Sequence, residues 1–118
     1  MSENLNTFSV SIPIDSTTAA TVPIWKCSAE GGGVTLMHAY LMGVGTATTQ
    51  LVTMSNIGTP AVNGTLVTSA AGTVSAGVPK EFTLGTAFVE GGLWVGWVMT
   101  AGTLLAGSYL QLIGVHGK

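Results

Sequence analysis

Hydrophobic and polar residues alternate along much of the chain, and this pattern predicts β-strands. In residues 7–12 the apolar side chains of Phe8, Val10 and Ile12 alternate with hydroxyl-bearing residues. Successive side chains of a half-buried strand point to opposite faces in this way. Pro13 predicts that this end of the strand lies at a sheet edge or leaves the sheet. No segment has the apolar spacing and charged pairs of an amphipathic helix, so an all-β fold is expected.

Further segments of this kind recur along the chain, with Gly, Asn and Pro between them. The longest, 34–42, is largely apolar on both faces and is expected near the centre of the fold. Regular alternation would place His38 on the same face as Leu36 and opposite to Ala39. The predicted strands cover residues 7–12, 21–27, 34–42, 50–57, 63–69, 81–84, 87–89, 93–99 and 109–115, and residues 70–79 are predicted to be a connection.

The number and spacing of these strands predict one β domain. At 118 residues the chain has the size of a single domain, and residues 1–118 show no linker or internal repeat. About eight antiparallel strands fit a β-sandwich of the jelly-roll kind, and a small β-barrel is the alternative. Residues 1–8 begin with polar side chains and then carry Leu5 and Phe8, so they are a candidate N-terminal arm.

The low charge of the chain restricts its function. Only 7% of the residues are charged, against about 25% in a typical soluble domain. The three basic residues, Lys26, Lys80 and Lys118, are too scattered to neutralise phosphates, which excludes nucleic-acid binding. All charged side chains together cover on the order of a sixth of the roughly 6,000 Å² that a monomer of this size exposes. Such a surface suits burial against other protein, so a homo-oligomer or a larger assembly is expected.

Residues that could carry chemistry are few. A metal site would have to draw on His38, His116 and Cys27, and no close spacing pairs them. No serine lies in a Gly-x-Ser-x-Gly motif, and Asp15 is the only aspartate, so a catalytic triad is not expected. The sequence therefore predicts no enzyme, no metal and no cofactor.

The N-terminus and the apolar C-terminal part bear on the compartment. Cys27 is the only cysteine, which excludes an intramolecular disulfide, and the N-terminus lacks the features of a secretion signal. Synthesis in a cytoplasm is therefore expected. Residues 91–115 carry no charge and are long enough to span a membrane. Glycines such as Gly102 and Gly107 interrupt the run, and no Lys/Arg cluster flanks it, so two strands joined by a loop are predicted instead.

Tryptophan spacing supplies a candidate contact residue. Trp94 and Trp97 are three positions apart and would point to opposite faces of a strand. One would then lie in the core while the other anchors an interface, where Trp is enriched; alternatively, both are core residues on the two faces of a central strand. Leu5, Phe8 and Trp94 are the predicted partner-contact residues.

Four segments together resemble a known group of viral proteins. Val34–Leu41, Leu51–Gly58, Phe88–Leu93 and Tyr109–Ile113 are similar in order and pattern to the small decoration (cement) proteins of tailed-phage capsids and to the jelly-roll modules of phage head fibres. The resemblance implies a non-enzymatic virion protein, often a homotrimer. Such a protein binds the outer surface of the major capsid protein near local three-fold axes, after synthesis in the host cytoplasm.

Two other functions remain open. A carbohydrate- or receptor-binding module of a phage fibre would need an exposed aromatic platform beside Asp, Asn or Gln, for which Tyr40, Tyr109 and Trp25 are candidates. A tail-tube or other ring-forming virion protein would stack into long tubes on its own.

Overall fold

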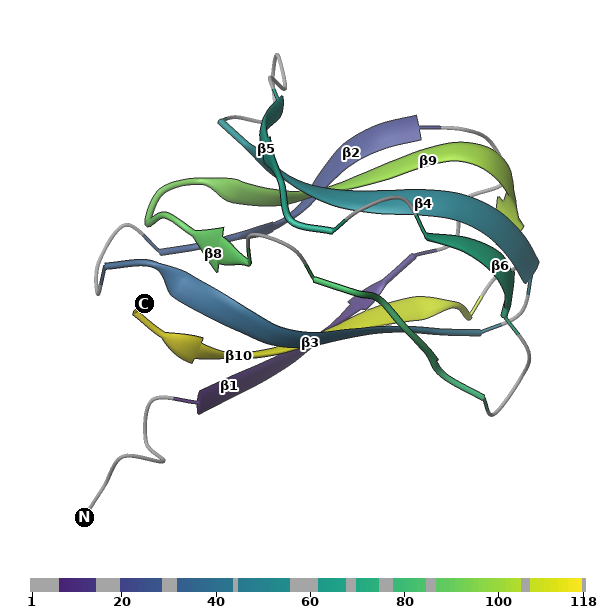
Figure 1. Ribbon diagram of the computed structural model, residues 1–118, viewed down its shortest axis with the longest axis horizontal. Coiled ribbons are helices and arrows are strands. Elements are labelled where there is room, and N and C mark those ends of the chain that lie inside the picture. The colour runs from purple at the N-terminus through teal and green to yellow at the C-terminus, as the bar shows by residue number, and fades with distance from the viewer. Residues whose placement is uncertain are drawn as a thin grey trace.

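Two antiparallel β-sheets pack face to face in this computed structural model, which describes residues 7–14, 20–28, 32–43, 45–55, 62–67, 70–74, 78–84, 87–104 and 107–117 (Figure 1). None of these residues is helical. This confirms the predicted all-β sandwich. The first sheet contains β1 (Thr7–Pro13), β10 (Tyr109–His116) and β3 (Val34–Met42), with β7 (Lys80–Glu81) and β8 (Phe88–Val89) both paired to β3. The second contains β2 (Ala20–Lys26), β9 (Trp94–Leu104) and β4 (Gly45–Met54), with β5 (Val62–Thr65) and β6 (Ala70–Val74) both paired to β4.

The connectivity of the strands is that of a jelly roll. β5 and β6 share one position beside β4, and β7 and β8 share one position beside β3, so the ten strands found among the described residues occupy eight positions. Numbered by position, the first sheet has the order 1-8-3-6 and the second 2-7-4-5. The chain crosses from one sheet to the other at nearly every connection, as it does in the double-sheet folds of this kind.

The two sides of the sandwich differ. On the side of β5 and β7, an antiparallel bridge between Val67 and Leu84 joins the sheets. On the other side, β1 and β2 form the two edges and no ladder joins them within the described ranges. There the Phe8 and Trp25 rings stack, with centroids 5.4 Å apart. The fold is therefore a sandwich and not a closed barrel.

Strand boundaries differ from the predicted ones where the residues are small. β4 begins at Gly45, and β6 lies within residues 70–79, which were predicted to be a connection. The backbone of 45–49 pairs with β6 on one side and with β9 on the other. Backbone pairing needs no apolar alternation, so Thr- and Ala-rich segments can form a ladder that the hydrophobic pattern does not reveal.

The prediction that residues 91–115 form two strands is confirmed. β9 lies in the second sheet and β10 in the first, each antiparallel to its own neighbours. In the part of the chain that the structure describes, no helix is long and apolar enough to cross a membrane.

A β-bulge in β3 reverses the expected faces of this strand. Gly114 of β10 lies opposite Leu36 and Ile113 opposite His38, so Met37 has no partner. Leu36 and Ala39 are both buried, whereas Met37 and His38 are both exposed. The prediction that His38 shares a face with Leu36 is therefore wrong, because the extra residue shifts the alternation by one position.

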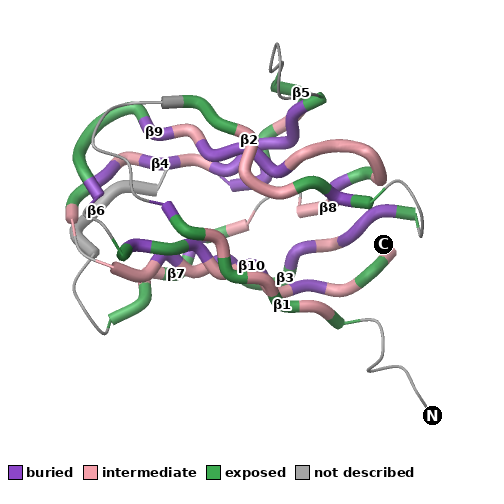
Figure 2. The backbone as a smooth tube through the Cα atoms, turned by 180° about the vertical axis from the view of Figure 1, so that it is seen from behind, coloured by how far each residue is buried: buried purple, intermediate pink, exposed green. Residues whose placement is uncertain are grey.

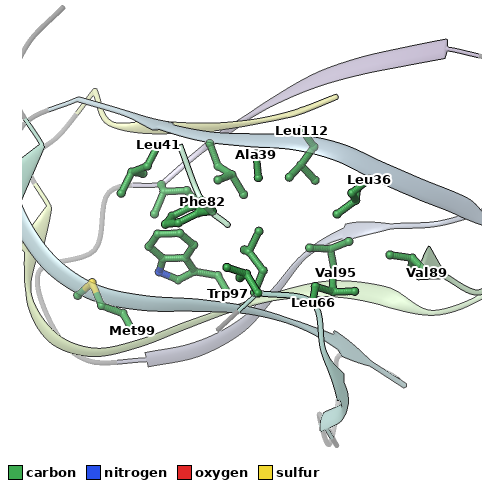
Figure 3. Close-up of a cluster of buried hydrophobic side chains, with 14 of the residues drawn as sticks. Leu36, Ala39, Leu41, Leu66, Phe82, Val89, Val95, Trp97, Met99 and Leu112 are labelled. Carbon is green, nitrogen blue, oxygen red and sulfur yellow. The ribbon is translucent and has the colours of Figure 1, made fainter. Parts of the chain in front are cut away.

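The core lies between the sheets and is built from alternate residues of their strands (Figure 3). Trp97 reaches from β9 into this space on the side of Phe82 and Leu41, and its indole Nε1–H has no hydrogen-bond partner in the described structure. Trp97 is therefore the core residue that the spacing of the tryptophans predicts. The buried cluster comprises Ile14, Cys27, Val34, Leu36, Ala39, Leu41, Ala47, Leu51, Leu66, Val67, Phe82, Val89, Val95, Trp97, Met99, Leu104, Leu110 and Leu112.

Candidate functional site

The outer face of the first sheet, turned away from the core, gathers aromatic and polar side chains. On β10, Leu110 and Leu112 are fully buried, so the alternation turns Tyr109, Gln111 and Ile113 outward. On β3 the bulge sends the following alternate residues outward in the same way. We call this surface the outer face; it comprises Ser9, Ser11, Pro13, Met37, His38, Tyr40, Met42, Glu81, Tyr109, Gln111 and Ile113.

The register of the strands lines up residues that are far apart in the sequence. Gln111 lies between Ser11 on β1 and Tyr40 on β3, and Tyr40 is in turn opposite Glu81 on β7. Opposed residues of an antiparallel pair have side chains on the same face, close enough to touch. One row across the sheet therefore presents a hydroxyl, an amide, a phenol and a carboxylate.

Polar contacts connect this row to the next one, in which Ser9, Ile113 and His38 lie opposite one another. His38 Nδ1 and Glu81 Oε2 are 3.0 Å apart, and the His38 ring stacks on Tyr40 with centroids 5.8 Å apart and an interplanar angle of 13°. Gln111 Nε2 donates to Ser9 Oγ at 3.2 Å. About half of each side chain of the His38–Glu81 pair is exposed, so solvent screens the pair and it contributes little to stability. Its exposed groups are available to a partner.

Apolar side chains complete the outer face. Met37 is 55% and Tyr109 37% exposed. Beside Tyr109 the surface dips into a hollow of about 340 Å³, lined by Ser11, Pro13, Gly107, Ser108 and Tyr109. The outer face therefore offers ring surfaces, hydrogen-bonding groups and one shallow depression, a combination suited to binding.

Of the three predicted contact residues, the two that the structure describes, Phe8 and Trp94, are not brought together. Leu5 lies outside the described residues. Phe8 belongs to β1 and packs against the core beside Trp25, so the last two residues of the candidate arm, Thr7 and Phe8, are part of the sandwich. Trp94 is half-buried on the outside of the second sheet, opposite Lys26 and Met54.

The metal-ligand candidates lie in different environments. His38 pairs with Glu81 on the outer face, and the His116 ring packs at an angle against Phe8. Cys27 is buried, 1% exposed, and its burial raises the pKa of the thiol. No group of three or more His, Cys, Asp or Glu residues gathers within the described ranges.

Two of the three candidate platform residues, Tyr40 and Tyr109, share the outer face, whereas Trp25 does not. Sequence reasoning missed the contribution of His38, Glu81 and Gln111. The alternation of Gln111 with two leucines in β10 shows that its side chain faces outward, but its position in one row with Tyr40 and Glu81 depends on strand order. Comparison with family models, with curated proteins and with solved structures gives no significant match.

Proposed function

We propose that this protein is a non-enzymatic structural protein of a virus particle, which binds the outer surface of the major capsid protein and stabilises the shell. The observation that carries the proposal is the outer face of the first sheet. It displays Tyr109, Tyr40 and Met37, and Glu81 is its only carboxylate among the described residues. The jelly-roll topology and the resemblance to capsid decoration proteins support the same function.

The outer face has the properties of a protein-binding surface. Aromatic residues and Met are enriched in the centres of interfaces, where charged residues are depleted. Tyr40 and Tyr109 would act as anchors that fill depressions on the capsid, and the His38–Glu81 pair would lie at the rim. Binding across the boundary between capsid subunits would hold them together without any chemical step.

Cosedimentation with capsid shells tests this function. The shells are assembled from the major capsid protein encoded in the same genome, and we expect the chain to sediment with them. Tyr40→Ala combined with Tyr109→Ala should weaken binding more than tenfold, the effect of removing two anchors of about 1 kcal/mol or more each. Val22→Ala, on the edge strand of the second sheet, is the matched control. Equal binding by both variants, or no binding by the natural chain, would contradict the proposal.

Self-association is part of the proposal, with a homotrimer as the expected unit. Light scattering after size exclusion should then give three times 11.9 kDa. The contribution of the N-terminal arm is tested by removing residues 2–6, because Thr7 and Phe8 belong to β1. Loss of capsid binding with an unchanged melting temperature is expected. Unchanged binding would exclude the arm as a contact.

One observation favours a second function, a carbohydrate-binding module. Tyr40 and Tyr109 lie on one face. Gln111 is opposite Tyr40 and two residues from Tyr109 on β10, which gives the combination of aromatic and amide groups that sugar recognition needs. Glycan-array binding by the natural chain that Tyr40→Ala abolishes, without any binding to shells, would establish this alternative in place of capsid binding.

A further inference from the structure

β1 is an edge strand whose only usual protection against pairing is a proline, Pro13, at its last position. It pairs only with β10 in the described structure, along all seven of its residues. It carries no charged residue and no bulge. Natural proteins protect exposed edges with charges, prolines or bulges. The edge strand of the second sheet, β2, has all three, with Pro23, Lys26 and a register shift between Pro23 and Trp25. The two neighbouring edges thus differ in a property that controls association.

The alternation of hydrogen bonds between β1 and β10 shows which backbone groups of β1 point to the open edge. Ile14 N–H donates to the carbonyl of Ser108 at 2.8 Å, and this pair continues the β1–β10 register. In an antiparallel ladder, residues bonded to the neighbour alternate with residues whose N–H and C=O point the other way. The even-numbered residues of β1 therefore bond to β10, and the N–H and C=O groups of Ser9 and Ser11 point to the open edge.

The position of Pro13 is consistent with this alternation of hydrogen bonds. As an odd-numbered residue its missing N–H falls on the open edge, so the proline removes no bond from the β1–β10 ladder. The structure thus leaves the ladder intact up to Ile14, while the open edge presents both the N–H and the C=O of Ser9 and of Ser11.

The sequence of β1 is nearly the same in both directions about Val10. Phe8-Ser9-Val10-Ser11-Ile12 has a hydroxyl on each side of Val10 and an apolar side chain beyond each hydroxyl. If two copies pair antiparallel with Val10 opposite Val10, Ser9 of each copy faces Ser11 of the other. Phe8 then faces Ile12, on the side of the core. From Phe8 to Ile12, the opposed residues therefore match in polarity.

We infer that β1 pairs with β1 of a second copy, antiparallel and centred on Val10, and thereby extends the first sheet across a two-fold axis. The two Ser9–Ser11 pairs form four backbone hydrogen bonds. Self-complementarity is the property that a two-fold contact requires, because the same patch must fit itself. It favours a second copy over an unrelated strand as the occupant of this edge.

Pairing through β1 would also bury apolar residues of this strand more fully. Phe8, Val10 and Ile12 are half-buried and pack against the core. Along β1, intermediate and exposed residues alternate (Figure 2). A second β1 would cover this row, whereas the opposite side of the sandwich is already closed by the Val67–Leu84 bridge. One strand pair buries less area than the 1,600 Å² or so of a standard stable interface. A concentration-dependent equilibrium is therefore expected, and not a permanent dimer.

This inference goes beyond the proposed function and does not depend on it. A two-fold contact through β1 would be distinct from the contact that forms a trimer. Neighbouring local three-fold positions on a shell are related by local two-fold axes, so the two contacts could coexist and link decoration units into a net.

Light scattering of the purified chain from about 1 µM to about 1 mM tests the pairing. The mass is expected to double from its low-concentration value. Ser9→Lys combined with Ser11→Lys places lysines opposite each other twice and should raise the dissociation constant about tenfold or more. Ser9→Lys combined with Ser11→Glu keeps two new charges per copy but opposes unlike ones, and should restore the association. Thr21→Lys on β2 is the control for added charge.

A second experiment tests whether the backbone groups of Ser9 and Ser11 form the hydrogen bonds across the edge. Ser11→Pro removes an N–H that faces the open edge and should leave the chain folded while weakening association more than tenfold. In the natural chain, amide exchange at Ser9 and Ser11 should slow as the concentration rises.

A mass independent of concentration, or exchange at Ser9 and Ser11 that does not change, would overturn the inference. A trimer whose mass responds to none of the β1 variants would also overturn it, while leaving the proposed function intact.

Discussion

The bulge in β3 makes a quantitative prediction about two single-residue deletions. Met37 is the unpaired residue, and without it Leu36 would be followed directly by His38. Inward and outward residues would then alternate without interruption, with the buried ones unchanged. Deleting Ala39 also removes one residue, but regular alternation would then place His38 at the buried position of Ala39. The same change in length therefore has opposite effects on the core.

The magnitudes follow from burial. Full burial of a methionine contributes about 1.5–3 kcal/mol, and Met37 is 55% exposed, so deleting it should lower the free energy of unfolding by about 0.7–1.4 kcal/mol. Ala39 is completely buried. Forcing an imidazole into its position combines overpacking, about 1–3 kcal/mol, with burial of a polar group, about 1–3 kcal/mol. That sum is a large part of a typical domain's stability.

Urea unfolding monitored by circular dichroism and tryptophan fluorescence measures both variants. We expect the Met37 deletion to keep the midpoint close to that of the natural chain, and the Ala39 deletion to lower it severely or to prevent folding. Two deletions of equal effect would refute the bulge and the assignment of faces derived from it.

Other predictions concern single contacts. At Gly96→Ala the new methyl group would meet Met54 Sδ, with Met54 Cγ at 2.6 Å and Val52 Cγ2 at 3.0 Å, so a loss of about 1–3 kcal/mol in urea unfolding is expected. A smaller loss in a Met54→Ala background is expected too, and equal losses would contradict the contact. Because burial raises the pKa of the Cys27 thiol, the folded state holds this proton to higher pH than the unfolded state. Stability should therefore be full at neutral pH and fall as the pH rises above about 8.5. The Cys27→Ala variant should not show this part of the fall. Phe8→Leu keeps apolar volume but removes the ring stack on Trp25, and should lower stability by about 0.5–1.5 kcal/mol in thermal unfolding; no change would argue against the stack.

Apolar alternation predicted the strands in which one face is buried. β1 and β10 lie close to their predicted positions because Val10 and Leu112 point inward while their neighbours do not. β3 was located correctly, yet its faces were not, because a bulge arises between two strands. It needs Gly114 of β10 opposite Leu36, and this pairing is not visible in either segment alone. β6 was missed because its Ala and Gly residues give no hydrophobic period.

The candidate site was less accessible to sequence reasoning than the fold. Tyr40, Glu81 and Gln111 come from three segments, and only the jelly-roll order places β3 between β10 and β7. The shift at Met37 then decides that His38 and Tyr40 face outward. Local pattern could indicate that each residue lies on a surface, but not that they share one.

The outer face and the edge of β1 belong to the same sheet, and this has a consequence for binding. A two-fold axis that relates two antiparallel strands of one sheet is perpendicular to it, so pairing through β1 would place both outer faces on the same side. Two copies would then present their Tyr40 and Tyr109 side chains to one flat partner surface. Linked sites bind more tightly than either alone, because the second contact forms at high effective concentration. Weak pairing at β1 and moderate binding by each outer face would therefore suffice for firm attachment to a repetitive surface, while single copies in solution stay free to exchange.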